Sequence, residues 1–160
     1  MRGVKKLSIA TPLGQVVAAG SDLALHFLAF ADDPLMERFQ IVPEGSTLSL
    51  LSIKNELGGY FDGSLREFKT PIQLEGTPFQ QLAHRALIAI PYGQTMSYAQ
   101  QASAMERGKA SRAVGSANGK NPLAIIVPCH RIIQSSGAIG GYRGGIARKK
   151  WLLNHEKRFK

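Results

Sequence analysis

The residues best suited to chemistry in this chain stand together in the tetrapeptide Pro128-Cys129-His130-Arg131. Cys129 is the only cysteine among 160 residues, and an imidazole and a guanidinium follow it directly. A thiol reacts as its thiolate, which a neighbouring base or cation favours. The tetrapeptide therefore predicts a nucleophile, at the end of a buried β-like run over residues 123–127 that Pro128 stops. The alternative is a small buried hydrophobe, since free cysteines commonly behave as one.

The single cysteine also limits what the chain can contain. It excludes an intramolecular disulfide and any zinc site built from several cysteines, and it indicates a reducing, intracellular setting. We expect a cytoplasmic protein, associated with the nucleoid in a bacterium or located in the nucleus of a eukaryote. Apolar runs stay far short of the ~20 residues that a membrane span needs. The basic segment 1–6 is not followed by the apolar region of a signal peptide, so we expect neither membrane insertion nor secretion.

Charge is divided unevenly along the chain, whose formal net charge is +9. Residues 1–78 contain seven lysines and arginines and nine acidic residues, a net charge of −2. Residues 79–160 contain thirteen and two, a net charge of +11. A basic surface of this kind favours a polyanionic partner, and nucleic acid is the partner we predict. The alternative is a basic domain with no such partner.

Strands and turns dominate the elements predicted for the first half of the chain. The predicted strands are rich in apolar residues and cover residues 6–10, 15–19, 23–30 and 71–74. The turn Thr11-Pro12-Leu13-Gly14 joins the first two strands. One helix is predicted over residues 50–60, ending near Gly58-Gly59.

Helix signals are stronger in the second half. Thr77 as N-cap, Pro78 at the first helical position and Gln80 as the capping-box partner open an amphipathic helix. Its apolar residues recur with helical spacing up to Ile90, and Pro91-Tyr92-Gly93 ends it.

Two shorter helices are predicted next. Ser97 and Gln100 form a second capping box, which opens a helix that reaches about residue 105. After the turn Glu106-Arg107-Gly108, residues 109–118 favour another helix. Two short helices joined by a tight turn have the outline of a helix-turn-helix, although many helical proteins share that outline.

The last of these helices has an unusual surface. Its buried stripe is predicted to consist of Ala110, Ala113, Val114 and Ala117. Its other positions are small or carry a single cation: Ser111, Arg112, Gly115, Ser116 and Gly119. Gly115 costs about 1 kcal/mol of helix stability relative to alanine. A helix that lacks both charge and propensity favours close contact with a partner; core packing against the first half is the alternative.

Several motifs occur together in an order and spacing typical of one protein family. They are Ile90-Pro91-Tyr92-Gly93-Gln94-Thr95-Met96-Ser97-Tyr98, Arg112-Ala113-Val114-Gly115, Asn121-Pro122, Ile126-Val127-Pro128-Cys129-His130-Arg131-Ile132-Ile133, Gly140-Gly141-Tyr142, Gly144-Gly145 and Leu152-Leu153-Asn154-His155-Glu156. On these residues the chain resembles the O6-alkylguanine-DNA alkyltransferases, also called methylated-DNA–protein-cysteine methyltransferases. The resemblance is dense from Thr77 to Glu156 and looser before Thr77.

Two positions depart from the family's pattern. Glu106-Arg107-Gly108 stands where the family usually has a Gly-Asn/Arg-Pro type of turn. The missing proline affects the start of the helix predicted over residues 109–118, and with it the DNA contacts of that helix. His84 stands where many members have an aromatic residue.

The resemblance implies an α/β fold of two lobes. Residues 1–76 would form a ribonuclease-H-like small sheet with a helix, and residues 77–160 a mostly helical lobe with a helix-turn-helix. The implied partner is double-stranded DNA containing O6-alkylguanine, bound by a monomer without an obligate protein partner. Arg112 would replace a flipped-out nucleotide in the stack. The implied DNA-binding residues are Ala110, Ser111, Arg112, Ala113, Gly115 and Ser116.

The resemblance also implies the chemistry. Cys129 would attack the alkyl carbon, His130 would take the thiol proton through an ordered water, and Glu156 would orient His130 in a Cys-His-Glu relay. This relay implies a Cys129 pKa below the usual value of about 8.5. Tyr98 would donate to the guanine ring, and Asn121 would shape the turn before the active-site segment.

The base itself would be read by a further group of residues, namely Tyr98, Ile132, Tyr142, Arg143 and Gly144. No cofactor is implied. Some relatives bind zinc through cysteines in the N-terminal lobe, and since this chain has none there we expect no metal. The thioether product has no ready leaving group, so each molecule would act once.

Other interpretations of these residues remain open on sequence alone. Glu156 fits a solvated helix residue, Tyr98 a packing residue, and Arg131 either a phosphate contact or, as we favour, a structural brace. The basic run 148–150 is expected to be solvated or to face phosphate. Rival functions are a DNA-lesion binder, which would lack the reactive Cys129, a Cys-His-Glu hydrolase, whose base usually comes from a distant segment, and a helix-turn-helix regulator.

Overall fold

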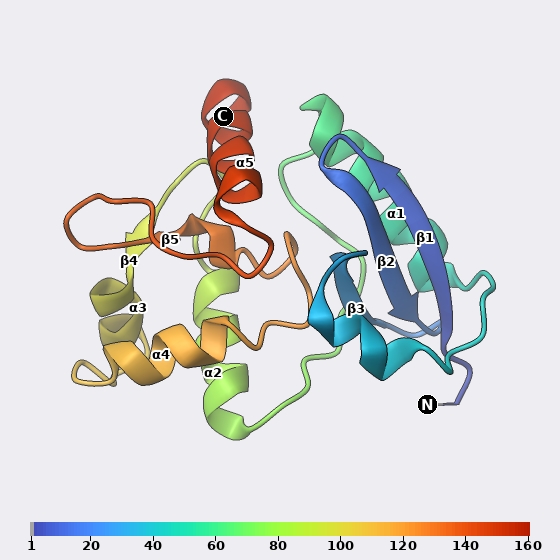
Figure 1. Ribbon diagram of the computed structural model, residues 1–160, viewed down its shortest axis with the longest axis horizontal. Coiled ribbons are helices and arrows are strands. Elements are labelled where there is room, and N and C mark those ends of the chain that lie inside the picture. Colours follow the sequence, from blue (N-terminus) through green and yellow to red (C-terminus); the bar gives the residue numbers. More distant parts are fainter. Residues whose placement is uncertain (1) are drawn as a thin grey trace. The chain divides into compact units, whose positions relative to one another are not determined.

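The chain folds into two compact units, each with its own helices and strands. The computed structural model describes residues 2–160 and groups the chain into a first unit, residues 1–74, and a second unit, residues 75–160 (Figure 1). The sequence placed this boundary two residues later, between residues 76 and 77. None of the helices formed by residues 2–160 has the length and apolarity of a membrane span.

The first unit is an antiparallel sheet with one long helix. The strands β1 (Lys5–Thr11), β2 (Gly14–Gly20) and β3 (Leu25–Phe30) lie in the order β1-β2-β3, and α1 (Leu48–Asp62) packs against them (Figure 1). A short 3-10 helix, η1 (Pro34–Phe39), follows β3. The strands predicted over residues 6–10, 15–19 and 23–30 are thus confirmed.

Two predictions in this unit were wrong. The helix α1 does not end at Gly58-Gly59 but continues to Asp62 and is capped by Gly63 in the left-handed conformation, with φ 89°. Leu57 and Tyr60 are buried on either side of the glycine pair, so packing holds the helix through it. The strand predicted over residues 71–74 is only an isolated bridge between Ile72 and Leu25, since Pro71 has no N–H to extend a ladder.

The second unit contains the remaining elements. The helices are α2 (Pro78–Ile88), α3 (Tyr98–Ala104), α4 (Ser111–Asn118) and α5 (Ile146–Phe159), with the 3-10 turn η2 (Cys129–Arg131). Two short strands, β4 (Met96–Ser97) and β5 (Ile132–Ile133), pair in parallel. Both predicted capping boxes are present, Thr77 with Gln80 and Ser97 with Gln100.

Three of these helices, α2, α3 and α4, enclose a small apolar core. Its buried members are Ala83, Ala102, Met105, Val114 and Ala117. Buried polar groups join the same helices: Gln101 and Asn118 exchange hydrogen bonds of 2.9 and 2.7 Å. The ring nitrogen Nε2 of His84 lies 2.9 Å from the carbonyl oxygen of Ala117. Burial lowers the pKa of His84, so the ring is neutral and a structural tie between α2 and α4.

The segment before Cys129 is buried but is not a strand, contrary to the prediction. Asn121 makes the difference, because its Oδ1 accepts the N–H of Leu123 at 2.9 Å and its Nδ2 donates to the carbonyl of Val127 at 2.8 Å. These bonds close the segment into a turn, in which Ile125 has a φ of 72°. Positive φ is rare for a β-branched residue, so the turn is held in place by its surroundings.

Candidate active site

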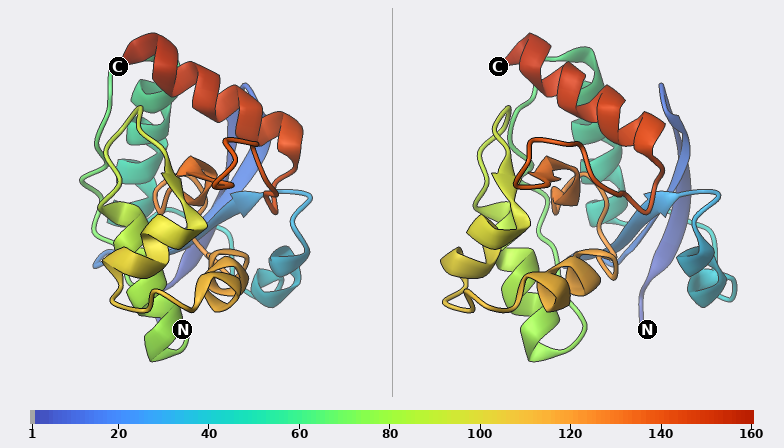
Figure 2. Two further views of the ribbon diagram at one scale, coloured as in Figure 1. Left: turned by 90° about the vertical axis from the view of Figure 1, so that its left-hand side faces the viewer. Right: turned by 60° about the vertical axis from the view of Figure 1, so that its left-hand side comes forward.

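Cys129 begins the turn η2, directly after Pro128, and its thiol opens to a cavity of about 210 Å³. The helix α5 packs on this turn (Figure 2). The other residues that line the cavity come from α3, the C-terminal part of α4 and the loop before α5: Tyr98, Gly115, Asn118, Gly119, Gly141, Tyr142 and Arg143. The structure thus brings Cys129 together with the predicted residues Tyr98, Gly115, Tyr142 and Arg143. Ile132 and Gly144 are not among the residues that line the cavity.

Behind the thiol lies a buried group of ionisable side chains. Nε2 of His130 is 2.7 Å from Oε2 of Glu156, and both side chains are almost completely buried. Nε and Nη2 of Arg131 donate to the two oxygens of the same carboxylate at 2.8 and 3.1 Å. Glu156 is therefore not the solvated residue that sequence alone allowed.

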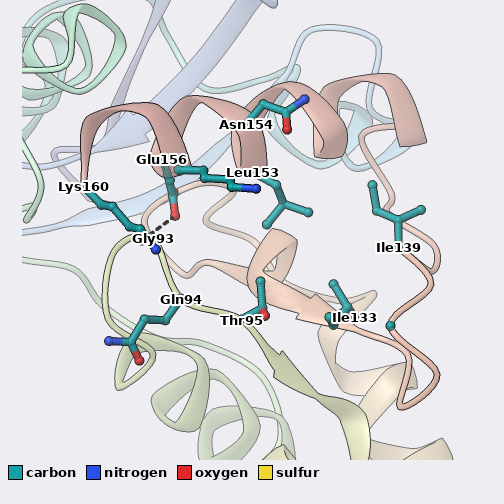
Figure 3. A pocket seen from close by; sticks show the side chains of 11 residues that line it. Gly93, Gln94, Thr95, Ile133, Ile139, Leu153, Asn154, Glu156 and Lys160 are labelled. Carbon is teal, nitrogen blue, oxygen red and sulfur yellow. Dashed lines mark hydrogen bonds between the residues drawn. The ribbon is translucent and has the colours of Figure 1, made fainter.

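The backbone of Gly93 also donates to Glu156. Its N–H donates to Oε1 at 3.2 Å, and Figure 3 shows this bond at one side of a second cavity, of about 390 Å³. Gly93 has a φ of 77°, and a Cβ there would lie 2.8 Å from the side chain of Lys160. A larger residue at position 93 would therefore displace the turn from the carboxylate.

Arg131 braces this arrangement, as the sequence analysis favoured. Besides its two bonds to Glu156, its Nη1 donates to the carbonyl of Ile90 at 2.7 Å. The side chain is buried, with 7% of its surface exposed, so it does not face phosphate. One guanidinium thus joins the segment after α2, the turn η2 and the helix α5.

The charge states of Glu156 and His130 leave His130 able to act as a base. Burial alone would raise the pKa of Glu156, but the hydrogen bonds from His130 and Arg131 and the charge of Arg131 outweigh it and keep the carboxylate ionised. Burial lowers the pKa of His130, and together with the charges of Arg131 and Lys149 it outweighs the opposite effect of Glu156, so the ring is neutral. Nε2–H then donates to Glu156, and Nδ1, which has no hydrogen-bond partner among residues 2–160, keeps its lone pair.

The prediction that the pKa of Cys129 lies below its usual value is wrong for the free protein. Burial raises the pKa of the thiol, and this effect outweighs the hydrogen bond from Asn121 Nδ2 at 3.4 Å and the charges of Arg143 and Lys149. The thiol is consequently protonated at rest and needs a base when it reacts. Burial also raises the pKa of Tyr98, which keeps its phenol as a hydrogen-bond donor.

Arg143 holds the wall of the cavity through its side chain. Its Nη1 donates to the carbonyl of Gly119 at 2.7 Å and its Nη2 to the carbonyl of Asn121 at 2.6 Å. The loop before α5 is thereby tied to the end of α4 and to the turn that presents Cys129. Asn121 thus shapes the active-site turn through both its side chain and its backbone.

The helix α4 presents small residues to solvent. Arg112, Ala113 and Ser116 are exposed, while Ala110 and Ser111 are partly buried. The prediction that Ala113 belongs to the buried stripe is wrong, because α4 packs through Val114 and Ala117. A Cβ at Gly115 would lie 3.5 Å from Tyr98, an ordinary contact, so packing does not require glycine there.

Lys149 was misjudged from the sequence. It was expected to be solvated with Arg148 and Lys150, but its side chain is completely buried. Its Nζ donates to the carbonyls of Ile132 at 2.5 Å and Gly141 at 3.0 Å. A signal was available, since Lys149 is three residues before Leu152 and seven before Glu156, which is the spacing of one helix face.

Comparison with known proteins finds a matching family model and similar proteins. A family model described as 6-O-methylguanine DNA methyltransferase, DNA binding domain, matches residues 78–158. The methylated-DNA–protein-cysteine methyltransferase of Mycobacterium bovis is 43% identical over 151 residues, which cover 94% of this chain and 90% of the relative. The protein of the same name from Salmonella typhimurium is 50% identical over 105 residues, which cover 65% of this chain and 61% of the relative.

A solved structure is similar over nearly the whole length. The crystal structure of Mycobacterium tuberculosis OGT in complex with DNA matches with a TM-score of 0.90 at 42% sequence identity. The match covers 97% of this chain and 94% of that chain.

Proposed function

Because this chain belongs to the methylated-DNA–protein-cysteine methyltransferase family, we propose that it repairs DNA by moving the alkyl group of O6-alkylguanine onto Cys129. One observation carries the assignment to this residue. The only thiol of the chain opens to a cavity, and a neutral histidine paired to a buried carboxylate follows it directly. A soft nucleophile beside a base is what displacement at a saturated carbon needs.

The transfer is a displacement in which atoms and charges balance. Sγ of Cys129 attacks the alkyl carbon, the S–C bond forms, and the bond from that carbon to O6 of guanine breaks with its electron pair. The thiol proton passes to Nδ1 of His130, through water, and Glu156 stabilises the imidazolium that results. Guanine leaves as the neutral base when Tyr98 donates a proton to its ring, and solvent returns the proton of His130 to Tyr98.

The target base has to leave the duplex before it can reach Cys129. Extrusion costs about a few kcal/mol, and a side chain that wedges into the stack offsets part of that cost. Arg112 fits this role because it is exposed and makes no hydrogen bond or ion pair with another of residues 2–160. Small neighbours, Ala113 and Ser116 among them, allow the backbone of α4 to approach the groove.

All the proposed catalytic groups come from one chain, so we propose that the protein acts as a monomer, in the compartment that holds the DNA. The residues in question are Tyr98, Asn121, Cys129, His130 and Glu156. Tyr142 and Arg143, which line the cavity, are proposed to face the base, whereas the contacts predicted for Ile132 and Gly144 are not proposed because neither residue lines the cavity.

Stoichiometry tests the function directly. With a tenfold excess of duplex carrying O6-methylguanine, we expect demethylation to stop at one lesion per protein molecule, because a thioether has no ready leaving group. Lesions that remain in the DNA are counted by liquid chromatography of the hydrolysed duplex, with heat-denatured protein as the control. A lesion binder would remove none, and a hydrolase would continue past one equivalent.

Arg112→Ala is expected to slow repair of duplex DNA at least tenfold and to leave the reaction with free O6-benzylguanine unchanged, because a free base needs no extrusion. Single-turnover rates on both substrates provide the measurement. Lys109→Ala, which removes a nearby exposed charge, is the matched control: it should weaken duplex binding and make that binding less dependent on salt, while leaving both rates unchanged at saturating DNA. Equal losses on both substrates would mean that Arg112 supports the fold or the chemistry instead.

A further inference from the structure

Lys149 carries a buried ammonium group to which the proposed reaction assigns no role. Its side chain is completely buried, whereas Lys150, the next residue, is exposed. Removing an ammonium from water is strongly unfavourable, even after the protein relaxes around it. A lysine that served only solubility would not be kept in this place.

Its two hydrogen bonds join the segment that follows Cys129 to the loop that lines the Cys129 cavity. The carbonyl of Ile132 belongs to β5, which directly follows the turn that carries Cys129, and the carbonyl of Gly141 belongs to the loop that lines the cavity. Gly140, with a φ of 73°, passes close by: a Cβ there would lie 3.7 Å from Nζ and 3.8 Å from the ring of Tyr98. The side chain thus ties α5 both to the segment that follows Cys129 and to one wall of the cavity.

The charge of Lys149 has no anionic partner among residues 2–160. Both of its acceptors are neutral carbonyls, and the nearby carboxylate of Glu156 is bound by His130, Arg131 and the N–H of Gly93. The group that can become an anion next to it is the thiol of Cys129. Lys149 favours that ionisation and opposes the protonation of His130, and Cys129 in turn favours the charged form of Lys149.

We propose that Lys149 is a positioning residue for alkyl transfer: it fixes the end of the Cys129 turn through Ile132 and one wall of the cavity through Gly141, and its charge stabilises the thiolate of Cys129 as it forms. This inference rests on the function proposed for Cys129. The other charged or titratable groups that act on the thiol are Arg143 and Tyr98, and neither is a carboxylate. Neither of these groups therefore neutralises the positive charge of Lys149, which can stabilise the thiolate.

Lys149→Met tests the charge, because methionine keeps the unbranched stem and removes the donors. We expect the pH midpoint for reaction of Cys129 with iodoacetamide to rise by about one unit, which is tenfold less thiolate at a given pH. Transfer from free O6-benzylguanine should slow at least tenfold. Lys150→Met, the exposed neighbour, should match the wild type in both measurements.

The titration decides the proposal. If Lys149→Met titrates like the wild type, the proposal is overturned even where transfer slows, because a purely structural tie would slow transfer without moving the thiol. Should the wild type fail to accept an alkyl group from DNA, the proposed function falls, while the iodoacetamide titration still tests the influence of Lys149 on the thiol.

A reciprocal measurement needs no variant of Lys149, in case Lys149→Met does not fold. Coupled groups shift each other by the same free energy. The Nζ resonance of Lys149, followed by NMR in ¹⁵N-lysine-labelled protein, should titrate at a lower pH in Cys129→Ser than in the wild type, because the thiolate that favours the ammonium is gone. Equal midpoints would overturn the proposal.

Discussion

Cys129→Ser is expected to fold and to bind alkylated duplex DNA, yet to gain no mass when it is incubated with that DNA. The wild type should gain the mass of one CH2 unit, and peptide mapping should place it on Cys129. Serine has nearly the shape of cysteine, so the cavity survives, but its hydroxyl is a far weaker nucleophile than a thiol. Intact-mass spectrometry before and after incubation measures the difference.

Duplex of the same sequence without the lesion is the control for this experiment and should leave the wild-type mass unchanged. A folded wild type whose mass stays constant with lesion-containing DNA would remove the alkyl-transfer assignment. A CH2 unit mapped to His130 would retain the activity but contradict the proposed acceptor.

Glu156→Gln should slow alkyl transfer by about 10²-fold, the lower range of general acid–base effects, because the imidazolium of His130 loses its anionic partner. It should also lower the free energy of unfolding by about 3–5 kcal/mol, since Arg131 is left as a buried charge without a carboxylate. His130→Ala should slow transfer similarly while leaving the ion pair of Arg131 with Glu156 intact. Single-turnover rates and denaturant unfolding separate the two effects.

Glu106→Gln is the matched control, because Glu106 is the only other acidic residue of residues 79–160 and is exposed. It should leave both the rate and the stability unchanged. Wild-type rates in His130→Ala and Glu156→Gln would show that the relay is structural only.

The pH dependence of the free energy of unfolding gives a second test of the His130–Glu156 pair. The folded pKa of His130 lies below its ordinary 6.5, so the unfolded chain binds more protons and stability falls as the pH drops below about 6.5. The folded pKa of Glu156 lies below its ordinary 4.5, so its contribution is present above about pH 4.5 and is lost on further acidification. Glu156→Gln should lack this second loss in urea unfolding followed between pH 3 and 7 by circular dichroism.

Helix starts were predictable because their determinants lie close together in the chain. The capping boxes of Thr77 with Gln80 and Ser97 with Gln100 each join residues three apart. Neither depends on how the rest of the chain folds, so the sequence pattern is sufficient.

Burial and conformation are separate properties, and this explains the wrong strand. An apolar composition predicted that residues 123–127 are buried, which they largely are. Their backbone bonds, however, are satisfied by the side chain of Asn121 instead of a neighbouring strand. In α1, too, the local sequence signal did not determine the conformation: the burial of Leu57 and Tyr60 keeps the helix intact through Gly58-Gly59.

The sequence by itself determined which residue can be the nucleophile, which half of the chain is basic and where the capped helices begin. Only the tertiary structure decided that Lys149 is buried, that the thiol of Cys129 is protonated at rest, and that Glu156 is held by the N–H of Gly93, 63 residues away. The physical reason is that burial and long-range hydrogen bonds depend on which segments pack together. A single sequence carries no local pattern for such contacts.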